Sequence, residues 1–446
     1  MTAPQLAMKD LRRVVIAAAV GNVIEWYDFY IFGSLAALLS VKFFEQGQAG
    51  AALIKTVGTF TAGFLIRPFG AFVFGRVGDL VGRKYTFVIT LSGMGLATAL
   101  IGVVPSYAQI GALAGVLLLV LRLIQGLCLG GEYGGAITYV AEHAPDEKRG
   151  YYTGWLQTSP TLGIVVSLAV IIVTRQIVGT EAFNAWGWRI PFLLSLLMVA
   201  IAIYIRLQLQ ETPIFQAIKA KGQTSTNPWR EAFWGENVKY VLIASIVVIG
   251  EGVVWYSGQF WALYFLQQIR KPDVLSPAII TGIALLIATP TLILFGWLSD
   301  RIGRKPIILA GFALASLTYY PLYTALGKAA DPANTNYPLA ILIVAIMVSY
   351  VGMVYGPIGA FLAEYFPARI RYTSVSVPYH IGNGWGGGLV PVITTAAYVS
   401  THSLGTALIY PITVPAVAFL LSLFLMPETR KISIWQPAQV RAGARG

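Results

Sequence analysis

The chain has 446 residues, of which 57% are hydrophobic and only 11% are charged, whereas soluble proteins average about 25% charged residues. Together with a mean hydropathy of +0.70, this composition excludes a soluble globular protein and predicts one that crosses a membrane many times. The net charge of +12 indicates no nucleic-acid partner, because basic residues collect in the cytoplasmic loops of membrane proteins.

Apolar segments long enough to cross a bilayer, which takes about 20 residues, follow one another along the chain. The first is too long for the apolar core of a signal peptide and precedes no small-residue cleavage site, so we expect no cleaved leader. The single cysteine, Cys128, lies in an apolar stretch, so disulfides contribute nothing. The sequence predicts an all-α membrane protein with twelve transmembrane helices, at residues 14–41, 51–78, 85–104, 108–141, 152–174, 189–208, 239–268, 275–298, 306–327, 337–364, 371–400 and 404–426.

The basic residues between these segments indicate the orientation of the chain. With the N-terminus in the cytoplasm, Lys and Arg are about three times as frequent on the cytoplasmic side as outside. An even number of spans returns the chain to the side on which it began. We therefore expect both termini in the cytoplasm of a multi-pass protein of the cell membrane, in bacteria the inner membrane. Two arginines, Arg67 and Arg122, remain inside spans.

Three short motifs occur twice in the chain, with copies separated by about 220 residues in each case. The pairs are GRVGDLVGRK at 75–84 and GWLSDRIGRK at 296–305, AEHAPDEKR at 141–149 and AEYFPARIR at 363–371, and QETP at 210–213 and PETR at 427–430. Three matches at nearly one offset indicate two homologous halves of six helices each. Such parallel repeats place a substrate site between the halves, near the middle of the membrane.

The repeat and the polar stretch between its copies predict the domain boundaries. We expect an N-terminal six-helix bundle at 1–208 and a cytoplasmic linker at 209–237, which contains Gly222, Ser225 and Pro228. A C-terminal six-helix bundle follows at 238–430, and a short cytoplasmic tail at 431–446.

These motifs also resemble those of a known family. GRVGDLVGRK and its copy resemble the loop signature of the major facilitator superfamily, and the Glu-x6-Arg pairs and PET motifs resemble its sugar-porter branch. GNVIEWYDFYIFG, RPFGAFVFGRVGD, RLIQGLCLGGEYGG and WGWRIPF together resemble the metabolite–proton symporter family, which carries 2-oxoglutarate, shikimate, citrate, proline and betaine. The resemblance covers about residues 14 to 430 and implies the major facilitator fold, with two pseudo-symmetric bundles that alternate in opening to each side.

The chain departs from the family pattern in two places. The osmosensory proline/betaine members tend to carry a long charged coiled-coil tail, whereas QPAQVRAGARG after the last predicted helix shows no heptads. This departure disfavours an osmosensor. In the eleventh segment, His380 follows Tyr379 where the family often has Asn, so the substrate contact there is expected to differ.

Ionisable residues inside membrane spans are costly and are therefore functional candidates. Glu25 and Asp28, in GNVIEWYDFYIFG, are three residues apart and share a helix face. A helical rise of about 1.5 Å per residue places Asp28, Arg67, Glu132 and Glu251 near the middle of a core about 30 Å thick.

Two carboxyl groups so close together do not both stay ionised without a cation nearby. The family resemblance implies an arginine of the fourth segment, here Arg122, beside the acidic face of the first. We therefore expect Asp28, Glu25, Arg122 and Glu132 to handle protons, with Arg122 paired to Asp28 until a proton arrives. A static ion-pair cluster that only fixes helix packing is the alternative, and Glu132 is equally well read as a structural acid. The glycines around it, from Gly126 to Gly135, favour close helix packing.

Arg67 has no acidic neighbour one turn away on its own helix, and a buried guanidinium requires an anion. Its planar fork suits a carboxylate, so we expect it to bind a carboxylate of the substrate. A salt bridge to Glu25 or Glu132 is the alternative. Oriented polar groups among aromatic rings are typical of a small-molecule cavity. The predicted substrate-binding residues are Arg67, Tyr27, Gln157, Trp255, Tyr256, Gln259, Tyr355, Tyr379, His380 and Asn383.

The repeated motifs between spans predict a cytoplasmic gate. Asp79 can accept hydrogen bonds from the start of a neighbouring helix. The Glu-x6-Arg spacing lets Arg83 and Arg149 pair with Glu142, and Arg304 and Arg371 pair with Glu364. The resemblance implies that this network holds the cytoplasmic side shut. Its predicted members are Asp79, Arg83, Glu142, Arg149, Asp300, Arg304, Glu364 and Arg371. The alternative is that these basic residues only mark the cytoplasmic side, but this does not explain why each copy also carries a matched glutamate.

No enzyme motif is present: the chain lacks a phosphate-cradling Gly–Lys loop, a nucleophile elbow and metal spacing among its three histidines. We expect a monomeric secondary transporter that imports a small organic carboxylate with protons, with no cofactor and no metal. The proton gradient supplies the energy. The alternatives are a zwitterion or osmolyte symporter of the same family, a sugar-porter-like carrier, and a sensor that binds solute without moving it.

Overall fold

The computed structural model describes most of the chain, and within that part the regular structure is helical throughout. The described residues are 8–45, 51–80, 83–207, 227–234, 237–269 and 275–434, with the isolated positions 212, 214, 216, 220, 222 and 225.

Each of the twelve predicted segments is helical. The N-terminal half contains α1 (Met8–Ser34), α2 (Ala36–Phe43), α3 (Ala51–Leu65), α4 (Arg67–Leu80), α5 (Arg83–Ile101), α6 (Tyr107–Ile110), α7 (Leu113–Gly130), α8 (Tyr133–His143), η1 (Asp146–Lys148), α9 (Arg149–Val178), α10 (Thr180–Ala182), η2 (Phe183–Gly187), α11 (Arg189–Leu193) and α12 (Ser195–Leu207). The later part contains α14 (Pro228–Phe233), α15 (Asn237–Tyr256), η3 (Ser257–Trp261), α16 (Ala262–Ile269), α17 (Leu275–Ala288), α18 (Pro290–Ile302), α19 (Arg304–Ala329), α20 (Tyr337–Tyr355), α21 (Ile358–Tyr365), α22 (Arg371–His380), η4 (Ile381–Gly386), η5 (Gly387–Leu389), α23 (Val390–Thr401) and α24 (Leu404–Leu425).

Not every predicted span is one straight apolar helix. In the described residues, eight helices are long and apolar enough to cross a membrane, or nine if the pair Thr180–Gly187 and Arg189–Ile205, bent by 52°, counts as one. The predicted first, third and eleventh spans are helical but are not among them. The first contains Glu25 and Asp28, and the eleventh is interrupted by η4 and η5. The first and eleventh predicted spans therefore differ from the others, because one carries buried acids and the other is broken.

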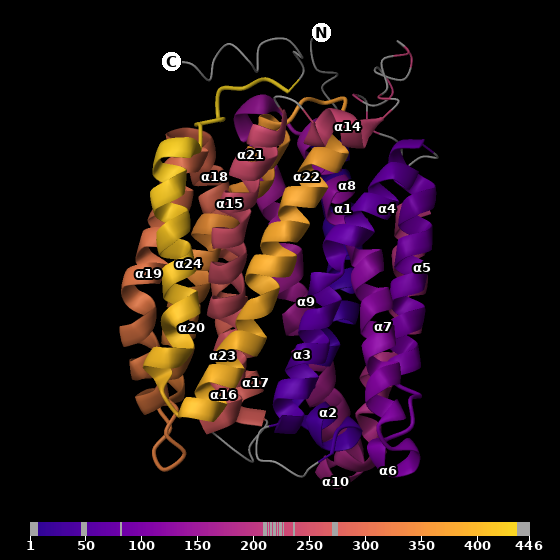
Figure 1. Cartoon of the computed structure of the whole chain (residues 1–446), viewed down its shortest axis with the longest axis vertical. Helices are drawn as coiled ribbons and strands as arrows, with labels where there is room; N and C mark the ends of the chain where they lie inside the picture. Colours follow the sequence, from indigo (N-terminus) through magenta and orange to yellow (C-terminus); the bar gives the residue numbers. More distant parts are fainter. Residues whose placement is uncertain are drawn as a thin grey trace.

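The two halves form two bundles that lie side by side, with the earlier helices in one and the later helices in the other (Figure 1). Helix α9 packs against α1 of its own bundle and against α17 and α18 of the other, and α22 packs against α4 and α8. Figure 1 shows α14, α21 and residues 426–434 at one end of the molecule, and α2, α6, α10 and α16 at the other. We call the first end cytoplasmic, as the charge distribution predicts.

The glycines of the fourth predicted span allow an unusually close helix contact, as predicted. A Cβ atom on Gly126 would lie 1.9 Å from the carbonyl oxygen of Gly63, and one on Gly130 would lie 2.2 Å from that of Arg67. No side chain fits at such distances, so α7 touches the backbone of α3 and α4 directly. This contact fixes the break between α3 and α4, where Arg67 lies, against α7.

Candidate functional site

Arg67 is the first residue of α4, directly after the break that ends α3. Pro68 favours this break, because proline fits the first turn of a helix and lacks the N–H that a continuous helix would need. The side chain is fully buried. Its guanidinium carbon lies 5.3 Å from the ring centre of Trp26, 5.5 Å from that of Phe64 and 5.8 Å from that of Tyr379. In the described part of the chain, none of its three nitrogens has a hydrogen-bond partner.

Aromatic rings from both halves surround this arginine. Tyr30 stacks on Trp26 at 4.9 Å within the N-terminal half and on Trp255 of the other half at 5.6 Å. Phe64 meets Tyr256 edge to face at 5.0 Å. These pairs fill the space between the bundles and exclude water from the guanidinium. A cation in such a place is attracted by the ring faces but gains no hydrogen bond from them.

Several buried polar atoms near the same seam also lack a hydrogen-bond partner among the described residues. They are both ring nitrogens of His380, both amide atoms of Gln259, Nε1 of Trp255, Oγ of Ser257 and Oε1 of Glu251. Buried polar groups are normally paired, because leaving one unpaired costs about 1–3 kcal/mol. His380 directly follows Tyr379, whose ring lies 5.8 Å from the Arg67 guanidinium. Unpaired polar atoms of the C-terminal half therefore occur together with the unpaired arginine, as expected for a site that a polar ligand completes.

Other predicted substrate residues are already bonded to one another. Asn383 Nδ2 donates to Glu251 Oε2 at 2.8 Å, and the hydroxyls of Tyr355 and Tyr379 lie 2.8 Å apart. Gln157 Nε2 donates to the carbonyl oxygen of Tyr355 at 3.0 Å, which links α9 to α20 across the seam. The structure therefore brings residues from both halves together, as the repeat predicted.

Tyr27 is the exception among the predicted substrate residues. Its hydroxyl donates to the carbonyl oxygen of Pro191 at 2.6 Å, inside the N-terminal half. Neighbouring helix residues point about 100° apart, so Trp26 faces Arg67 while Tyr27 turns toward α11. The residues that sequence reasoning missed on this helix are Trp26 and Tyr30, whose spacing of four places them on one face.

Arg122 does not pair with the carboxylate of Asp28, which differs from the prediction. Its Nη1 donates to the carbonyl oxygen of Phe29 at 3.0 Å and to Gln125 Oε1 at 2.7 Å. The guanidinium also lies over the Phe29 ring, 4.1 Å from its centre. Phe29 and Asp28 are consecutive, so an arginine docked on the first lies away from the side chain of the second.

Asp28 is fully buried, and neither carboxylate oxygen has a hydrogen-bond partner in the described residues. Its backbone carbonyl accepts hydrogen bonds from Thr98 Oγ1 and Gln125 Nε2, at 3.4 and 3.3 Å. These contacts place residue 28 on the side of α1 that packs on α5 and α7. The ring of Trp26, two residues earlier, stacks on Tyr30, which itself contacts Trp255 of the other half. The acid and the aromatic site therefore occupy opposite sides of one helix.

The other two predicted proton-handling acids lie in separate surroundings. Glu25 is buried and lies beside Asn22, whose amide, oriented to satisfy both its atoms, donates to Glu25 Oε2 at 3.0 Å. Glu132 lies in the turn between α7 and α8, and its Oε1 accepts a hydrogen bond from Thr90 of α5 at 2.7 Å. Glu25 therefore contacts a residue of its own helix, whereas Glu132 contacts α5.

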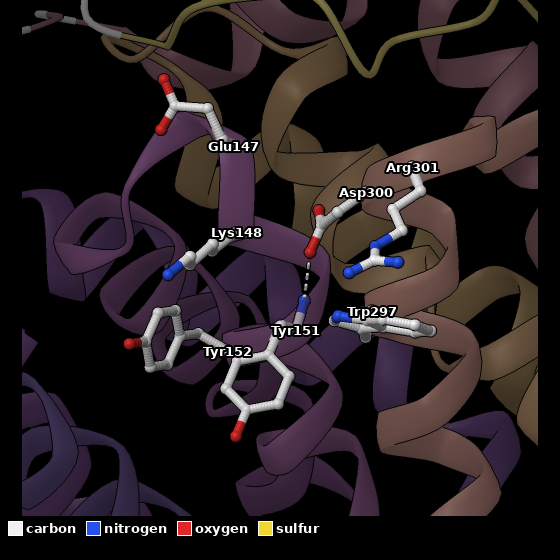
Figure 2. A pocket seen from close by; sticks show the side chains of 7 residues that line it. All are labelled: Glu147, Lys148, Tyr151, Tyr152, Trp297, Asp300 and Arg301. Atoms are coloured by element: carbon white, nitrogen blue, oxygen red, sulfur yellow. Dashed lines mark hydrogen bonds between the residues drawn. The ribbon is translucent and has the colours of Figure 1, made fainter.

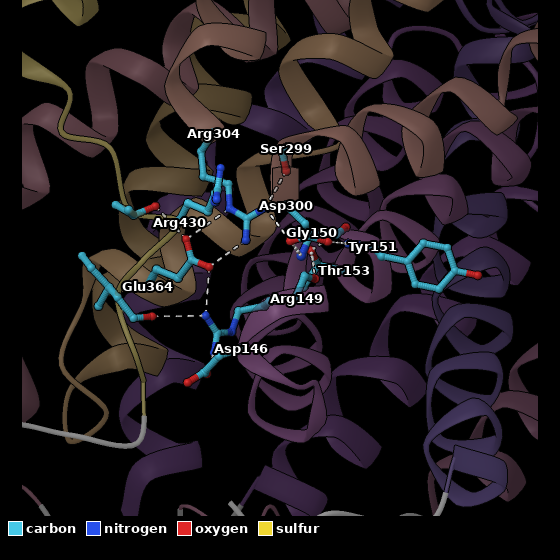
Figure 3. A network of polar contacts seen from close by, with 12 residues as sticks. Asp146, Arg149, Gly150, Tyr151, Thr153, Ser299, Asp300, Arg304, Glu364 and Arg430 are labelled. Carbon is cyan, nitrogen blue, oxygen red and sulfur yellow. Dashed lines mark hydrogen bonds and ion pairs between the residues drawn. The ribbon is translucent and has the colours of Figure 1, made fainter. Parts of the chain in front are cut away.

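At the cytoplasmic end, ion pairs join the two halves (Figure 3). Arg149 Nη1 lies 2.9 Å from Glu364 Oε1, and Arg371 Nη1 lies 2.9 Å from Glu142 Oε1. Arg304 also binds Glu364, with Nη2 2.9 Å from Oε1. All of these side chains are at most 2% exposed. Each repeated glutamate thus binds the arginine of the opposite half, which corrects the predicted pairing of Arg149 with Glu142 and of Arg371 with Glu364.

Asp300 joins the halves through the start of a helix. Its two carboxylate oxygens accept hydrogen bonds from the N–H groups of Gly150 and Tyr151, each at 2.8 Å, in the first turn of α9. A carboxylate is stabilised there by unpaired N–H groups and the helix dipole. This is the contact predicted for Asp79 on the first copy of the motif. The side chains of Asp79 and Arg83 lie outside the described residues.

Two threonines that the sequence analysis did not select complete this gate. Thr429 Oγ1 donates to Glu364 Oε2, and Thr212 Oγ1 donates to Glu142 Oε2, both at 2.7 Å. They occupy the same place in the two PET motifs, so the repeat itself was the signal that could have identified them. The segment that follows each half therefore donates a hydrogen bond to the gate glutamate of that same half.

Two helical bundles that enclose a buried, unpaired arginine, and that are joined by ion pairs at one end, define a membrane transporter whose halves meet around a central site. The chain belongs to the sugar (and other) transporter family, whose profile matches residues 14–227 and again residues 216–438. It is a metabolite transporter of the major facilitator superfamily and a multi-pass protein of the cell membrane, not an enzyme.

Similar proteins agree with this assignment. The chain is 31% identical over 432 residues to the glycine betaine/proline/ectoine/pipecolic acid transporter OusA of Dickeya dadantii, covering 94% of this chain and 84% of the relative. It is 32% identical to the alpha-ketoglutarate permease of Escherichia coli, covering 94% and 96%. Among solved structures, the proton:xylose symporter XylE, a major facilitator superfamily protein, matches 94% of this chain and 96% of its own at a TM-score of 0.75 and 17% identity, which shows the shared fold.

Proposed function

We propose that this protein is a proton-coupled symporter that takes up a small organic carboxylate by alternating access. The observation that carries the proposal is Arg67, a fully buried guanidinium with no hydrogen-bond partner in the described residues. Removing an ion from water carries a penalty of several kcal/mol unless a partner restores its interactions. A substrate carboxylate would do so through two parallel hydrogen bonds, which the guanidinium fork accommodates.

The position of Arg67 supports this role. It lies at a helix break on the seam between the halves, and the rings of Trp26, Phe64 and Tyr379 surround it. The alternative prediction is a salt bridge to Glu25 or Glu132, but no hydrogen bond joins the guanidinium of Arg67 to either acid within the described residues. The names of relatives also fit, since one of them is a permease for alpha-ketoglutarate, which is a carboxylate.

Uptake into proteoliposomes tests the carboxylate site. Arg67→Gln should weaken carboxylate binding by about 10- to 100-fold, because a charge-assisted hydrogen bond contributes about 1.5–3 kcal/mol. Arg67→Lys, which keeps the charge but loses the fork, should recover only part of the affinity. Arg175→Gln, in the last turn of α9 and away from the central site, is the matched control. Unchanged affinity in Arg67→Gln would exclude this residue from the site.

Proton coupling is assigned to Asp28 within the same proposal. Its carboxylate is buried inside the N-terminal bundle without a hydrogen-bond partner in the described residues. The charged form is therefore costly there, and binding a proton while the site is closed to water removes that cost. Asp28→Asn should abolish uptake driven by a pH gradient while sparing exchange of labelled for unlabelled substrate. If the variant retains gradient-driven uptake, Asp28 does not carry the proton.

A zwitterion symporter is the second candidate, and Glu251 is the observation that favours it. This buried acid of α15 uses Oε2 to bind Asn383, but Oε1 has no partner in the described residues. A carboxylate in the C-terminal half and Arg67 in the other would suit the two ends of a molecule such as proline or betaine. Thermal stabilisation by betaine or proline, but not by 2-oxoglutarate, would select the zwitterion candidate over a plain carboxylate. Absence of flux with retained binding would indicate a sensor.

A further inference from the structure

A cavity of about 390 Å³ lies at the cytoplasmic end, between the two halves and beside the contact of Asp300 with α9 (Figure 2). One wall comes from η1 and the start of α9, and the other comes from α18. Its lining residues are Glu147, Lys148, Tyr151, Tyr152, Trp297, Asp300 and Arg301. It is distinct from the central site around Arg67, because it opens at the surface of the molecule.

The charges of this cavity suit an anion. Lys148 and Arg301 are exposed, and they extend from opposite walls. No ion pair joins either of them to another described residue, and Arg301 lies over the Trp297 ring at 3.9 Å. The carboxylate of Asp300 is already bound by the N–H groups of Gly150 and Tyr151. Figure 2 shows the carboxylate of Glu147 turned away from the other lining residues. Two cations therefore remain uncompensated within the cavity.

The cavity lies at the depth of lipid headgroups. Lys148 directly precedes α9, and Arg301 is in the last turn of α18, where the apolar span Leu275–Ile302 ends. Tyrosine and tryptophan, which both line the cavity, prefer this boundary. One turn further into the membrane, Trp155 on α9 and Leu294 on α18 are 42% and 49% exposed. Phosphate chemistry at the mouth and apolar side chains below it match a phospholipid better than a soluble anion.

We propose that this cavity binds the phosphate headgroup of an anionic phospholipid of the cytoplasmic leaflet and that the bound lipid favours the state in which the halves are joined at this end. Basic pockets between helices on the cytoplasmic side are a general means of binding such headgroups. Lys148 belongs to one half and Arg301 to the other. When α9 and α18 separate, the two cations move apart with their helices, so a headgroup that contacts both binds the joined state better and shifts the equilibrium toward it.

The test measures conformation and lipid binding on the full chain in nanodiscs. Spin labels at Pro145→Cys and Ala368→Cys, in a Cys128→Ser background, report the distance between the halves at the cytoplasmic end. Nanodiscs of phosphatidylcholine are compared with nanodiscs that also contain phosphatidylglycerol, and native mass spectrometry counts the retained lipids. Phosphatidylglycerol should increase the ratio of the short-distance to the long-distance population at least threefold and remain bound at one molecule per chain.

Charge variants separate this site from general surface attraction. Lys148→Gln with Arg301→Gln should abolish both the shift and the retained lipid, whereas Lys148→Arg with Arg301→Lys, which keeps both charges, should preserve them. Lys328→Gln with Arg175→Gln removes two charges from the opposite end and should change neither. A full response in the doubly neutralised variant overturns the proposal. An equal shift caused by inorganic phosphate in phosphatidylcholine nanodiscs would overturn the assignment to a lipid.

Discussion

The two halves meet through charges at the cytoplasmic end and through aromatic rings in the middle of the molecule. At the end, Arg149 and Arg371 bind glutamates of the opposite half at 2.9 Å. In the middle, Tyr30 stacks on Trp255 and Phe60 packs against Phe260, with ring centres 5.6 and 5.2 Å apart.

This difference in chemistry suits two tasks. Ion pairs depend strongly on geometry, so they are either formed or broken, and water can solvate both partners once the end opens. A gate built from them has two distinct states. Ring contacts are less directional, and offset or edge-to-face arrangements are all favourable. An aromatic enclosure can therefore adjust around a substrate without losing its packing.

The largest expected effect comes from Glu364, which binds arginines of both halves. Glu364→Gln leaves Arg149 and Arg304 without their shared carboxylate, and breaking a buried pair on one side costs about 3–5 kcal/mol. The joined state should lose most of its population, which the distance between labels at residues 145 and 368 would show.

Glu181→Gln, an exposed acid at the opposite end, is the control for this variant and should leave the distance distribution unchanged. If Glu364→Gln also left the halves joined, the ion pairs would not hold the gate.

A smaller effect is expected from the two threonines of the PET motifs. Thr429→Val removes one hydrogen bond to Glu364 but keeps both arginines, so it should destabilise the joined state by about 1.5–3 kcal/mol, as for other bonds to charged groups. Thr212→Val should have a similar effect through Glu142. Equal shifts in the label distances would show that the gate is symmetric, and an effect of only one variant would show that one of the two threonine contacts dominates.

The smallest effect on the cytoplasmic gate is expected from the aromatic region. Phe260→Leu keeps an apolar side chain but loses five ring pairs within the described residues, among them those with Tyr30 and Phe60, each contributing about 0.5–1.5 kcal/mol beyond burial. The melting temperature should fall, while the label distance at the cytoplasmic end, which reports the gate, stays the same. Phe424→Leu, at a position 81% exposed, is the control. Opening of the cytoplasmic end by Phe260→Leu would contradict the separation of the two regions.

The cytoplasmic gate shows which features the internal repeat could predict and which it could not. Spacing alone identified Glu142, Arg149, Glu364 and Arg371 as a set, because the same pattern occurs twice. It also predicted pairing within each copy, since sequence separation is short there. The structure exchanges the partners, because α9 and α22 begin where the two bundles touch, so each arginine reaches the glutamate of the opposite half.

The first helix shows the same limit. The motif GNVIEWYDFYIFG marked the helix as functional, and the resemblance placed Arg122 beside it. The arginine is beside it, but it binds the carbonyl of Phe29 and not Asp28. Which of two neighbouring residues an arginine contacts depends on the rotation of the helix, and the contact of Tyr30 with Trp255 of the other half is one of the long-range contacts that fix this rotation.

By itself, the sequence determined the membrane class, the helical segments, the two related halves and the identity of most gate residues. Hydrophobic length, charge asymmetry and internal repetition are local or additive properties that a chain carries in any conformation. Only the tertiary structure decided the partners: which glutamate meets which arginine, that Tyr27 turns away from the seam, and that Arg67 and Asp28 have no hydrogen-bond partner in the described residues. Those contacts depend on helix rotation and on the crossing of two bundles, which arise from packing between residues far apart in the chain.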